Sequence, residues 1–315
     1  METSIHAIAC NKLLILFATI AITGIICSKG SELINIPDVV LFLIVGIFLG
    51  PSVLQIIDIS QFQLENQLIL TFGSAFILYM GGKEVSLKVL KNVKISVFLL
   101  STLGVVITSF LMAKLIGLNF QISFMTCLLA GSIIASTDPA TIVPIFNQVK
   151  IDKKVKQTVI SESALNDATG AIMTVAVLSI IMGGKFSIQQ NIYSLCIMII
   201  VGIMVGLITG LVLLFLVNDS PKGIFKDYTP IISILSVIIA YELSTYLGGS
   251  GYMSCFIVGL VTGNKQNFKL WLSQKHYDAD CHVAETVGTI CRMCIFIILG
   301  SQVQLDVLFK YLGPS

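Results

Sequence analysis

Apolar runs of about 20 residues recur along the chain between short polar loops, and a helix of that length crosses the ~30 Å hydrocarbon core of a bilayer. Ten such runs occur in the 315 residues. Only 11% of the residues are charged, against roughly 25% in soluble domains. The run at 231–240 does not alternate apolar and polar residues, which argues against a transmembrane barrel. The sequence therefore predicts an all-α, polytopic protein in a lipid bilayer, and its net charge of +2 gives no indication of a nucleic-acid partner.

Hydropathy, together with the positions of Gly, Pro and Lys, sets the bounds of the predicted spans. They cover residues 10–28, 37–54, 66–82, 95–116, 122–147, 156–182, 191–217, 229–247, 251–264 and 281–302. Fourteen of the eighteen lysines fall in the loops that follow odd-numbered spans. Because lysine is enriched in cytoplasmic loops, we expect these loops inside the cell and the N-terminus outside, in a plasma or inner membrane.

An internal repeat relates the two ends of the chain. Residues 45–50 (VGIFLG) resemble residues 258–263 (VGLVTG), and residues 76–78 (FIL) resemble residues 296–298 (FII). The first match relates the second and ninth spans, and the other relates the third and tenth. Both pairs are seven spans apart, so the two copies cross the membrane in opposite directions. Inverted repeats of this kind are typical of secondary transporters.

The repeat sets the expected division of a single transmembrane domain over residues 1–315. We assign residues 1–182 to the first repeat, 183–228 to a linking helix and 229–315 to a partial second repeat. The first repeat has six spans and the second has three, so three helices of the inverted copy are missing. We therefore expect a truncated chain, or one that needs a second chain to supply those C-terminal helices.

Asp138 lies within the fifth span, in the sequence STDPATIVP. Pro139 and Pro144 each remove a backbone N–H and should break the helix near the middle of the membrane. Open backbone is tolerated at that depth only where protein or a water-filled cavity surrounds it. Its carbonyl groups, beside a carboxylate, are hard oxygen ligands suited to a small alkali cation. A proline kink with a helix-capping Asp138 is the structural alternative.

The sixth span carries the polar cluster SESALNDATG. Ser163 and Asp167 are four residues apart and share one helix face, with Glu162 and Asn166 on the adjoining stripe. The apolar run at residues 172–181 continues the span, so we place the cluster within the bilayer rather than on a solvated helix face. Carboxylates at that depth are costly and usually functional.

Two motifs on neighbouring spans carry a family resemblance: Thr137-Asp138-Pro139, and Glu162-Ser163 followed by Asn166-Asp167. With them, the chain resembles the monovalent cation:proton antiporter superfamily, specifically its sodium/proton exchanger branch. The likeness covers nearly all of the sequence. It implies alternating access, in which a core bundle moves against a dimerising panel, and two unwound helices that cross at mid-membrane. A homodimer is therefore expected.

The resemblance also implies roles for single residues, carried over by motif position. Asp167 is expected to bind either the cation or a proton, and Asp138 to contact the same monovalent cation. The further implied ligands and supporting groups are Glu162, Ser163 and the main chain at Thr137, with Asn166 as a hydrogen-bonding support and Pro139 as part of the opened helix. Arg292 is the only arginine and has no role in the family pattern. We expect it to neutralise an acidic neighbour such as Glu162, Glu242 or Glu285.

The expected function is secondary antiport of Na⁺ for H⁺ by competition at Asp167. The chain is expected to be no enzyme and to need no cofactor beyond the transported ions. In the related branch, two adjacent aspartates allow a second charge to move, whereas Asn166 replaces the first of them here, so one-for-one electroneutral exchange is expected. Two alternatives stay open: a K⁺/H⁺ antiporter, and a membrane sensor or regulatory subunit that binds a cation without transporting it.

Overall fold

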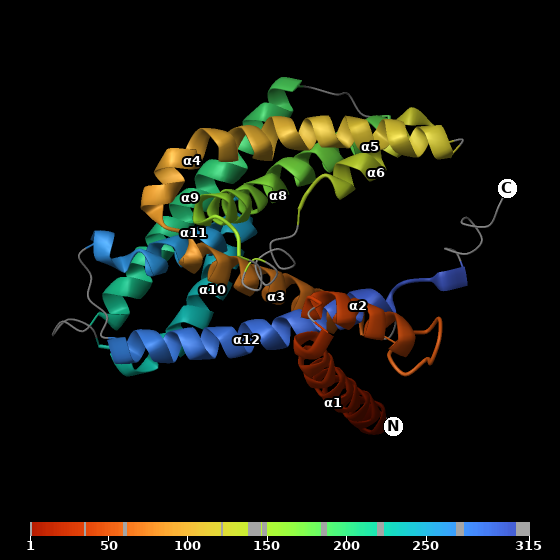
Figure 1. Ribbon diagram of the computed structural model, residues 1–315, viewed down its shortest axis with the longest axis horizontal. Coiled ribbons are helices and arrows are strands. Elements are labelled where there is room, and N and C mark those ends of the chain that lie inside the picture. The colour runs from red at the N-terminus through yellow and green to blue at the C-terminus, as the bar shows by residue number, and fades with distance from the viewer. Residues whose placement is uncertain are drawn as a thin grey trace. The chain divides into compact units, whose positions relative to one another are not determined.

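A computed structural model describes residues 2–306, apart from residues 35, 59–61, 121, 138–145, 147–149, 184–187, 219–223 and 269–273. The described residues form helices and loops and contain no strand. The α-helices, drawn in Figure 1, are α1 (Glu2–Ile34), α2 (Asp38–Leu49), α3 (Gln63–Glu84), α4 (Leu87–Leu99), α5 (Val105–Asn119), α6 (Phe124–Ile134), α8 (Lys153–Ile181), α9 (Ile188–Val217), α10 (Thr229–Tyr246), α11 (Gly251–Gly263) and α12 (Gln274–Ser301). A π-helical turn, η1 (Leu100–Gly104), joins α4 to α5, and two 3₁₀ turns are η2 (Lys226–Tyr228) and η3 (Lys265–Phe268).

Each of the ten predicted spans coincides with one or more of these helices, which confirms the all-α fold. Within the described part of the chain, six helical stretches are long and apolar enough to cross a membrane: Asn11–Ile34, Leu87–Asn119, Lys153–Ile181, Gln189–Val217, Lys226–Tyr246 and Lys275–Ser301. Three shorter apolar helices, α2, α6 and α11, accompany them. The protein is therefore a multi-pass membrane protein.

The fourth helix begins at Leu87, well before the predicted residue 95. The predicted span excluded this segment because of its lysines. In the structure Lys91 and Lys94 are exposed, whereas Val93 and Val97 are buried on another side of the same helix. An amphipathic segment can therefore extend the apolar span as one continuous helix. The tenth span also starts early, because α12 already begins at Gln274.

The chain divides into two compact units, and α3 and α12 each contribute to both. Unit 1 comprises Met1–Ser74 and Glu285–Ser315, and unit 2 comprises Ala75–Ala284. In unit 1, glycines bring α2 and α12 into backbone contact. A Cβ added to Gly46 would overlap the carbonyl group of Ile297, and one added to Gly50 would lie 2.7 Å from the carbonyl oxygen of Ser301.

Unit 2 contains an equivalent glycine contact between α11 and α3. A Cβ on Gly259 would overlap the carbonyl group of Tyr79, and one on Gly263 would overlap that of Lys83. Gly259 and Gly263 are the residues that the sequence repeat aligns with Gly46 in α2 and Gly50 directly after it. Small residues four apart let membrane helices approach closely. Both copies of the repeat therefore contain the same close helix contact at two glycines.

Replacement of Gly259 by alanine should therefore destabilise unit 2, by about 1–3 kcal/mol, because the added methyl group meets backbone that cannot rotate away. Gly117→Ala is the matched control, since its Cβ would find its nearest neighbour, Cys127 Sγ, at 3.6 Å. Helix propensity alone would make that change neutral or stabilising by up to about 1 kcal/mol. The free energy of unfolding in mixed micelles measures both variants, and equal values for the two would contradict the close contact.

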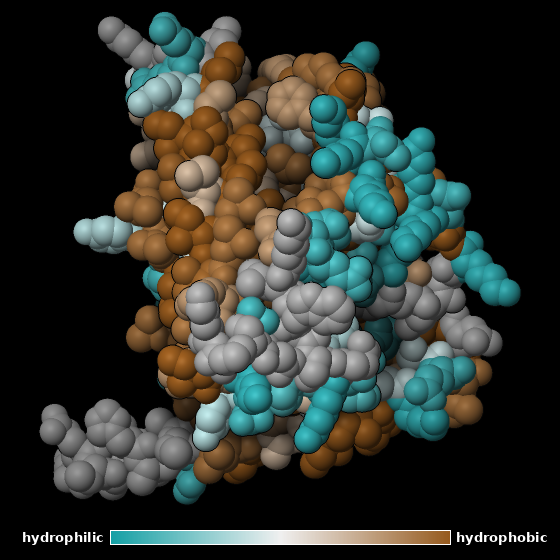
Figure 2. Space-filling model, turned by 90° about the vertical axis from the view of Figure 1, so that its left-hand side faces the viewer, coloured by the Kyte–Doolittle hydropathy of each residue, from teal (hydrophilic) through white to brown (hydrophobic). Residues whose placement is uncertain are grey.

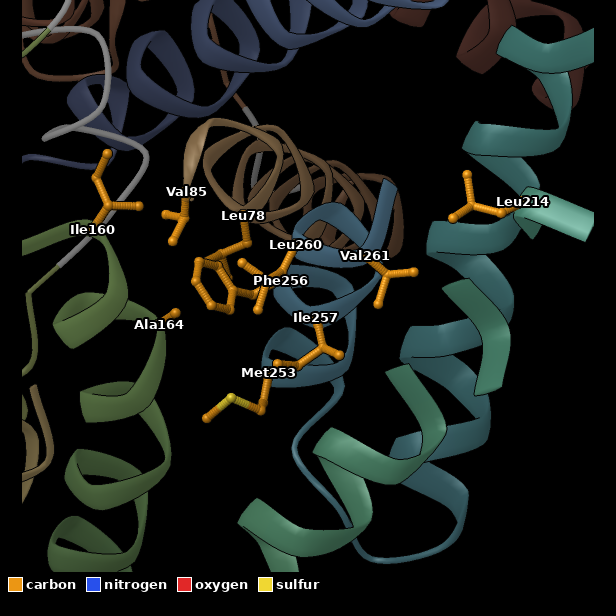
Figure 3. Close-up of a cluster of buried hydrophobic side chains, with 10 residues drawn as sticks. All are labelled: Leu78, Val85, Ile160, Ala164, Leu214, Met253, Phe256, Ile257, Leu260 and Val261. Carbon is orange, nitrogen blue, oxygen red and sulfur yellow. The ribbon is translucent and has the colours of Figure 1, made fainter. Parts of the chain in front are cut away.

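The core of unit 2 gathers side chains from α3, α8, α9 and α11, together with Val85 directly after α3 (Figure 3). Its buried members are Leu78, Val85, Ile160, Ala164, Leu214, Met253, Phe256, Ile257, Leu260 and Val261. Asn264, directly after α11, connects this core to the start of α4 by hydrogen bonds. Its Nδ2 donates to the carbonyl oxygen of Val85 at 2.7 Å, and its Oδ1 accepts from the N–H of Leu87 at 3.0 Å. The residues that precede α4 are thus fixed against the end of α11.

Large apolar side chains are exposed on the helices of the structure, as a lipid-facing surface requires. On α9, for example, Ile200, Met204 and Ile208 are four residues apart and all exposed, while Val205 on another side of the helix is buried. Figure 2 shows a broad hydrophobic area on one face, beside a gathering of hydrophilic side chains. Apolar exposure on this scale is typical of a protein whose solvent is the bilayer interior.

Sequence reasoning missed a buried ion pair in unit 2. Lys83 Nζ lies 2.6 Å from Asp280 Oδ2, and the two side chains are only 8% and 5% exposed. The ammonium group also lies 5.4 Å from the ring centroids of Tyr79 and Tyr277. The second carboxylate oxygen, Asp280 Oδ1, has no hydrogen-bond partner among the described residues. The pair therefore joins the last turn of α3 to the first turns of α12.

Candidate functional site

The polar cluster of the sixth span lies in the middle of α8. This helix starts directly after Asp152, whose carboxylate accepts the N–H groups of Lys154 and Val155 and so caps the helix. The neighbouring helix α6 packs against α8 and ends at Ile134. The end of α6 therefore brings Ser136 and Thr137 to the α8 cluster.

Ser136 joins the end of α6 to Asp167. Its hydroxyl group lies 2.9 Å from Asp167 Oδ1 and donates to it, and it lies 3.1 Å from Asn166 Oδ1. Gly170 leaves room for this approach, because a Cβ at that position would lie 3.0 Å from Ser136 Cβ. Ser132 and Thr174 make a second link along the same two helices, with their hydroxyl oxygens 3.1 Å apart.

Asn166 is the centre of the hydrogen-bond network. Its side chain is fully buried, and its Nδ2 donates to Thr137 Oγ1 at 2.6 Å and to Glu162 Oε1 at 2.8 Å. Its Oδ1 accepts from Ser136. The amide group thus fixes one carboxylate and two hydroxyl groups at once, and its own orientation is set by the same contacts.

Thr137 completes the network from the α6 side. Its hydroxyl oxygen lies 2.7 Å from Ser163 Oγ and 3.5 Å from Glu162 Oε2. Ser163 is fully buried, and Glu162 and Asp167 are both half-buried. The site therefore presents two carboxylates and three hydroxyl groups within one network.

The structure thus brings together Glu162, Ser163, Asn166 and Asp167 on α8 with the hydroxyl group of Thr137 after α6. The sequence analysis assigned a contact to the main chain of Thr137 instead, and the expected roles of these residues in cation binding stay predictions. Asp138 and Pro139 lie outside the described residues, and so does the predicted break in the fifth span. Arg292 belongs to unit 1, where its Nη2 donates to Thr289 Oγ1 at 3.1 Å and forms no ion pair within the described part of that unit. Its proposed neutralising role stays a prediction.

Ser136 is the residue that sequence reasoning passed over. It stands directly before Thr137 in the motif, and a hydroxyl at that position was visible in the sequence. What could not be seen was its direction, because Asp167 lies 31 residues further along the chain. The signal in the sequence is a hydroxyl residue on the segment that follows α6, and it indicates a hydrogen-bond partner for a carboxylate on α8.

The chemistry of this network suits a hard cation. Carboxylate and hydroxyl oxygens are hard ligands, which favour alkali and alkaline-earth ions over soft metals. Among the described residues, no group of three or more His, Cys, Asp or Glu side chains is arranged to hold a metal ion. The two carboxylates offer negative charge for a cation, and each also accepts a proton.

Comparison with known proteins decides the family. A model of the family described as "Sodium/hydrogen exchanger, transmembrane" matches residues 15–315. The chain belongs to this family. A relative named probable Na(+)/H(+) antiporter 2, from Methanocaldococcus jannaschii, is 28% identical in a 311-residue alignment that covers 93% of this chain and 69% of the relative. A K(+)/H(+) antiporter NhaP2 from Shewanella oneidensis is 27% identical over 92% of this chain and 49% of its own length.

A solved structure supports the same assignment. The sodium proton antiporter MjNhaP1 from Methanocaldococcus jannaschii, solved at pH 8, matches with a TM-score of 0.72 and 25% sequence identity. The match covers 95% of this chain and 75% of that one. The exchanger family and the all-helical fold are therefore established, and the resemblance inferred from the two motifs is confirmed.

Proposed function

We propose that the protein is a secondary antiporter that exchanges Na⁺ for H⁺ across a membrane. One observation carries the proposal: Asp167, a carboxylate in the middle of the apolar helix α8, is hydrogen-bonded by a hydroxyl group from the end of α6. The family assignment and the names of the Methanocaldococcus relatives support it.

Competition for one site drives the exchange in this proposal. Deprotonated Asp167 binds the cation, and protonation of Asp167 releases it. Ser136 serves both states, because a hydroxyl group donates to a carboxylate and, after rotation, offers a lone pair to a cation. A fully protonated or fully loaded carboxylate carries no net charge through the bilayer, whereas the empty anion is costly to move.

The further ligands are also proposals. Glu162, Ser163 and Thr137 lie in one network with Asn166, and we assign them to cation binding or its support. Asp138 and Pro139 keep the roles that the family motif implies. Asn166 is neutral where the related branch has a second aspartate, so we assign the exchange of cation for proton to Asp167 alone. The exchange is therefore expected to be electroneutral, one Na⁺ for one H⁺.

A K⁺/H⁺ antiporter is the second candidate, because several relatives carry that name. Oxygen ligands alone do not set the preferred cation size. A cation sensor without transport is the third reading. Measured flux distinguishes the three candidates. The two antiporters differ in the cation that dissipates a pH gradient, and a sensor dissipates none.

The experiment uses the transporter purified from the cell together with any chain that it is assembled with. The purified transporter is reconstituted in vesicles that hold a pH gradient. Added Na⁺ should dissipate the gradient at lower concentration than K⁺ does, and clamping the membrane potential at zero or at −100 mV should leave the rate unchanged. A rate that follows the potential would contradict electroneutral exchange. A gradient that no alkali cation dissipates would contradict antiport altogether.

Orientation and assembly complete the proposal. We propose a plasma or inner membrane, with the lysine-rich loops in the cytoplasm and the N-terminus outside. The orientation is inferred from the distribution of lysines among the loops. The family pattern supports a homodimer. A cysteine that replaces Lys91 should then react with an impermeant thiol reagent only from the cytoplasmic side.

A further inference from the structure

A cavity of about 350 Å³ lies in unit 2, away from the carboxylate network. It opens where α11 ends and α4 begins, and its walls include Ser86, Lys88, Asn264, Lys265, Gln266 and Tyr277. Ligand pockets for small molecules start at roughly this size, about 300 Å³. The wall is polar, with amide, hydroxyl and ammonium groups.

Two ammonium groups in this wall lack a carboxylate partner. Neither Lys88 nor Lys265 forms an ion pair among the described residues, whereas the nearby Lys83 is paired with Asp280 and Lys156 with Glu84. The Lys265 ammonium group lies 3.6 Å from the ring centroid of Tyr277, which holds it at the cavity wall. The cavity wall therefore carries two ammonium groups that no described carboxylate contacts.

The surroundings of Lys265 make that charge costly. Burial lowers the pKa of Lys265 below its ordinary value, and the ammonium group of Lys83 lowers it further, against the opposing effects of Cys281, Asp280 and Asp278. A bound anion would remove this cost. The start of α4 adds positive potential, because the N–H groups of a first helical turn have no acceptor within the helix.

We propose that this cavity binds a phosphate-bearing anion. Two lysines, a side-chain hydroxyl and side-chain amides match the several oxygen acceptors and the negative charge of a phosphate group better than they match a single carboxylate. The phosphate belongs either to the headgroup of an anionic lipid or to a soluble compound, since the cavity lies where apolar helices end. A bound phosphate would hold the start of α4 against the end of α11, as Asn264 already does.

The test for a soluble phosphate measures the thermal unfolding midpoint of the purified full chain in detergent, with sodium phosphate or sodium chloride at equal ionic strength. At about ten times its dissociation constant, phosphate should raise the midpoint by roughly 2–4 °C. Lys88→Gln and Lys265→Gln should each reduce that rise, and the double variant should abolish it. Lys94→Gln is the matched control on α4, because Lys94 is exposed and lies outside the cavity wall.

The test for a lipid headgroup incubates the same variants with vesicles of phosphatidylglycerol or phosphatidylcholine, re-extracts them in detergent and counts the retained lipid by native mass spectrometry. One phosphatidylglycerol retained by the wild type and Lys94→Gln, but not by Lys265→Gln, with no midpoint response to phosphate, identifies the headgroup. A phosphate response lost in Lys265→Gln, without retained lipid, identifies the soluble source. Equal behaviour of the wild type and both single variants in the two arms would overturn the proposal.

Discussion

Asp167→Asn should reduce sodium-driven proton flux to the level of protein-free vesicles. The amide has nearly the same size, and its oxygen can still accept the hydroxyl group of Ser136, so the helix pair α6–α8 keeps its contact. It neither carries a negative charge for the cation nor takes up a proton near neutral pH. The variant therefore separates the chemistry of the site from the fold around it.

The measurement compares flux per reconstituted protein in the transporter as the cell assembles it. Glu32→Gln is the control, since Glu32 is an exposed carboxylate that pairs with exposed Lys29 on α1. That variant should exchange at the wild-type rate. Sodium-dependent proton flux that persists in Asp167→Asn would show that another group exchanges the cation for the proton.

Asp280→Asn should destabilise the protein by about 3–5 kcal/mol, the range measured when one partner of a buried ion pair is removed. The loss arises because Lys83 is 8% exposed and would keep its charge without a counter-ion. The free energy of unfolding in mixed micelles gives the value. Removal of the exposed pair on α1 by Glu32→Gln should change it little, because exposed ion pairs are weak.

A double variant distinguishes the lost charge balance from lost packing. Lys83→Met with Asp280→Leu removes both charges and keeps apolar volume, and buried pairs replaced in this way are often neutral or stabilised. The double variant should therefore recover most of the stability that Asp280→Asn loses. A double variant that is less stable than the single one would show that the pair itself, and not the avoidance of an unpaired charge, stabilises the junction of α3 and α12.

Those parts of the fold that depend on local hydropathy could be predicted from the sequence. Each of the ten spans contains a helix in the described part of the chain, because an apolar segment in lipid must satisfy its own backbone hydrogen bonds. The start of α4 could not be predicted, because the lysines of this segment are typical of a loop. The burial of Val93 and Val97 on another side of the helix is visible only in the structure. Lys83 and Asp280 were missed for a different reason: they are 197 residues apart, and no local pattern pairs them.

The candidate site divides in the same way. Glu162, Asn166 and Asp167 were found because helical spacing sets them side by side on one segment. The links from Ser136 and Thr137 depend on the packing of α6 against α8, which hydropathy does not encode. The sequence therefore located the polar groups of α8, and the structure was needed to show that the hydroxyl groups of Ser136 and Thr137 contact them.

Sodium binding measured by calorimetry over a range of pH tests the central claim most directly, namely that one carboxylate binds either Na⁺ or H⁺. Competition with a single proton predicts that, in the acidic range, the apparent dissociation constant for sodium rises about tenfold for each unit that the pH falls. It also predicts that Asp167→Asn binds no sodium at this site. A dissociation constant that does not change with pH would contradict the account.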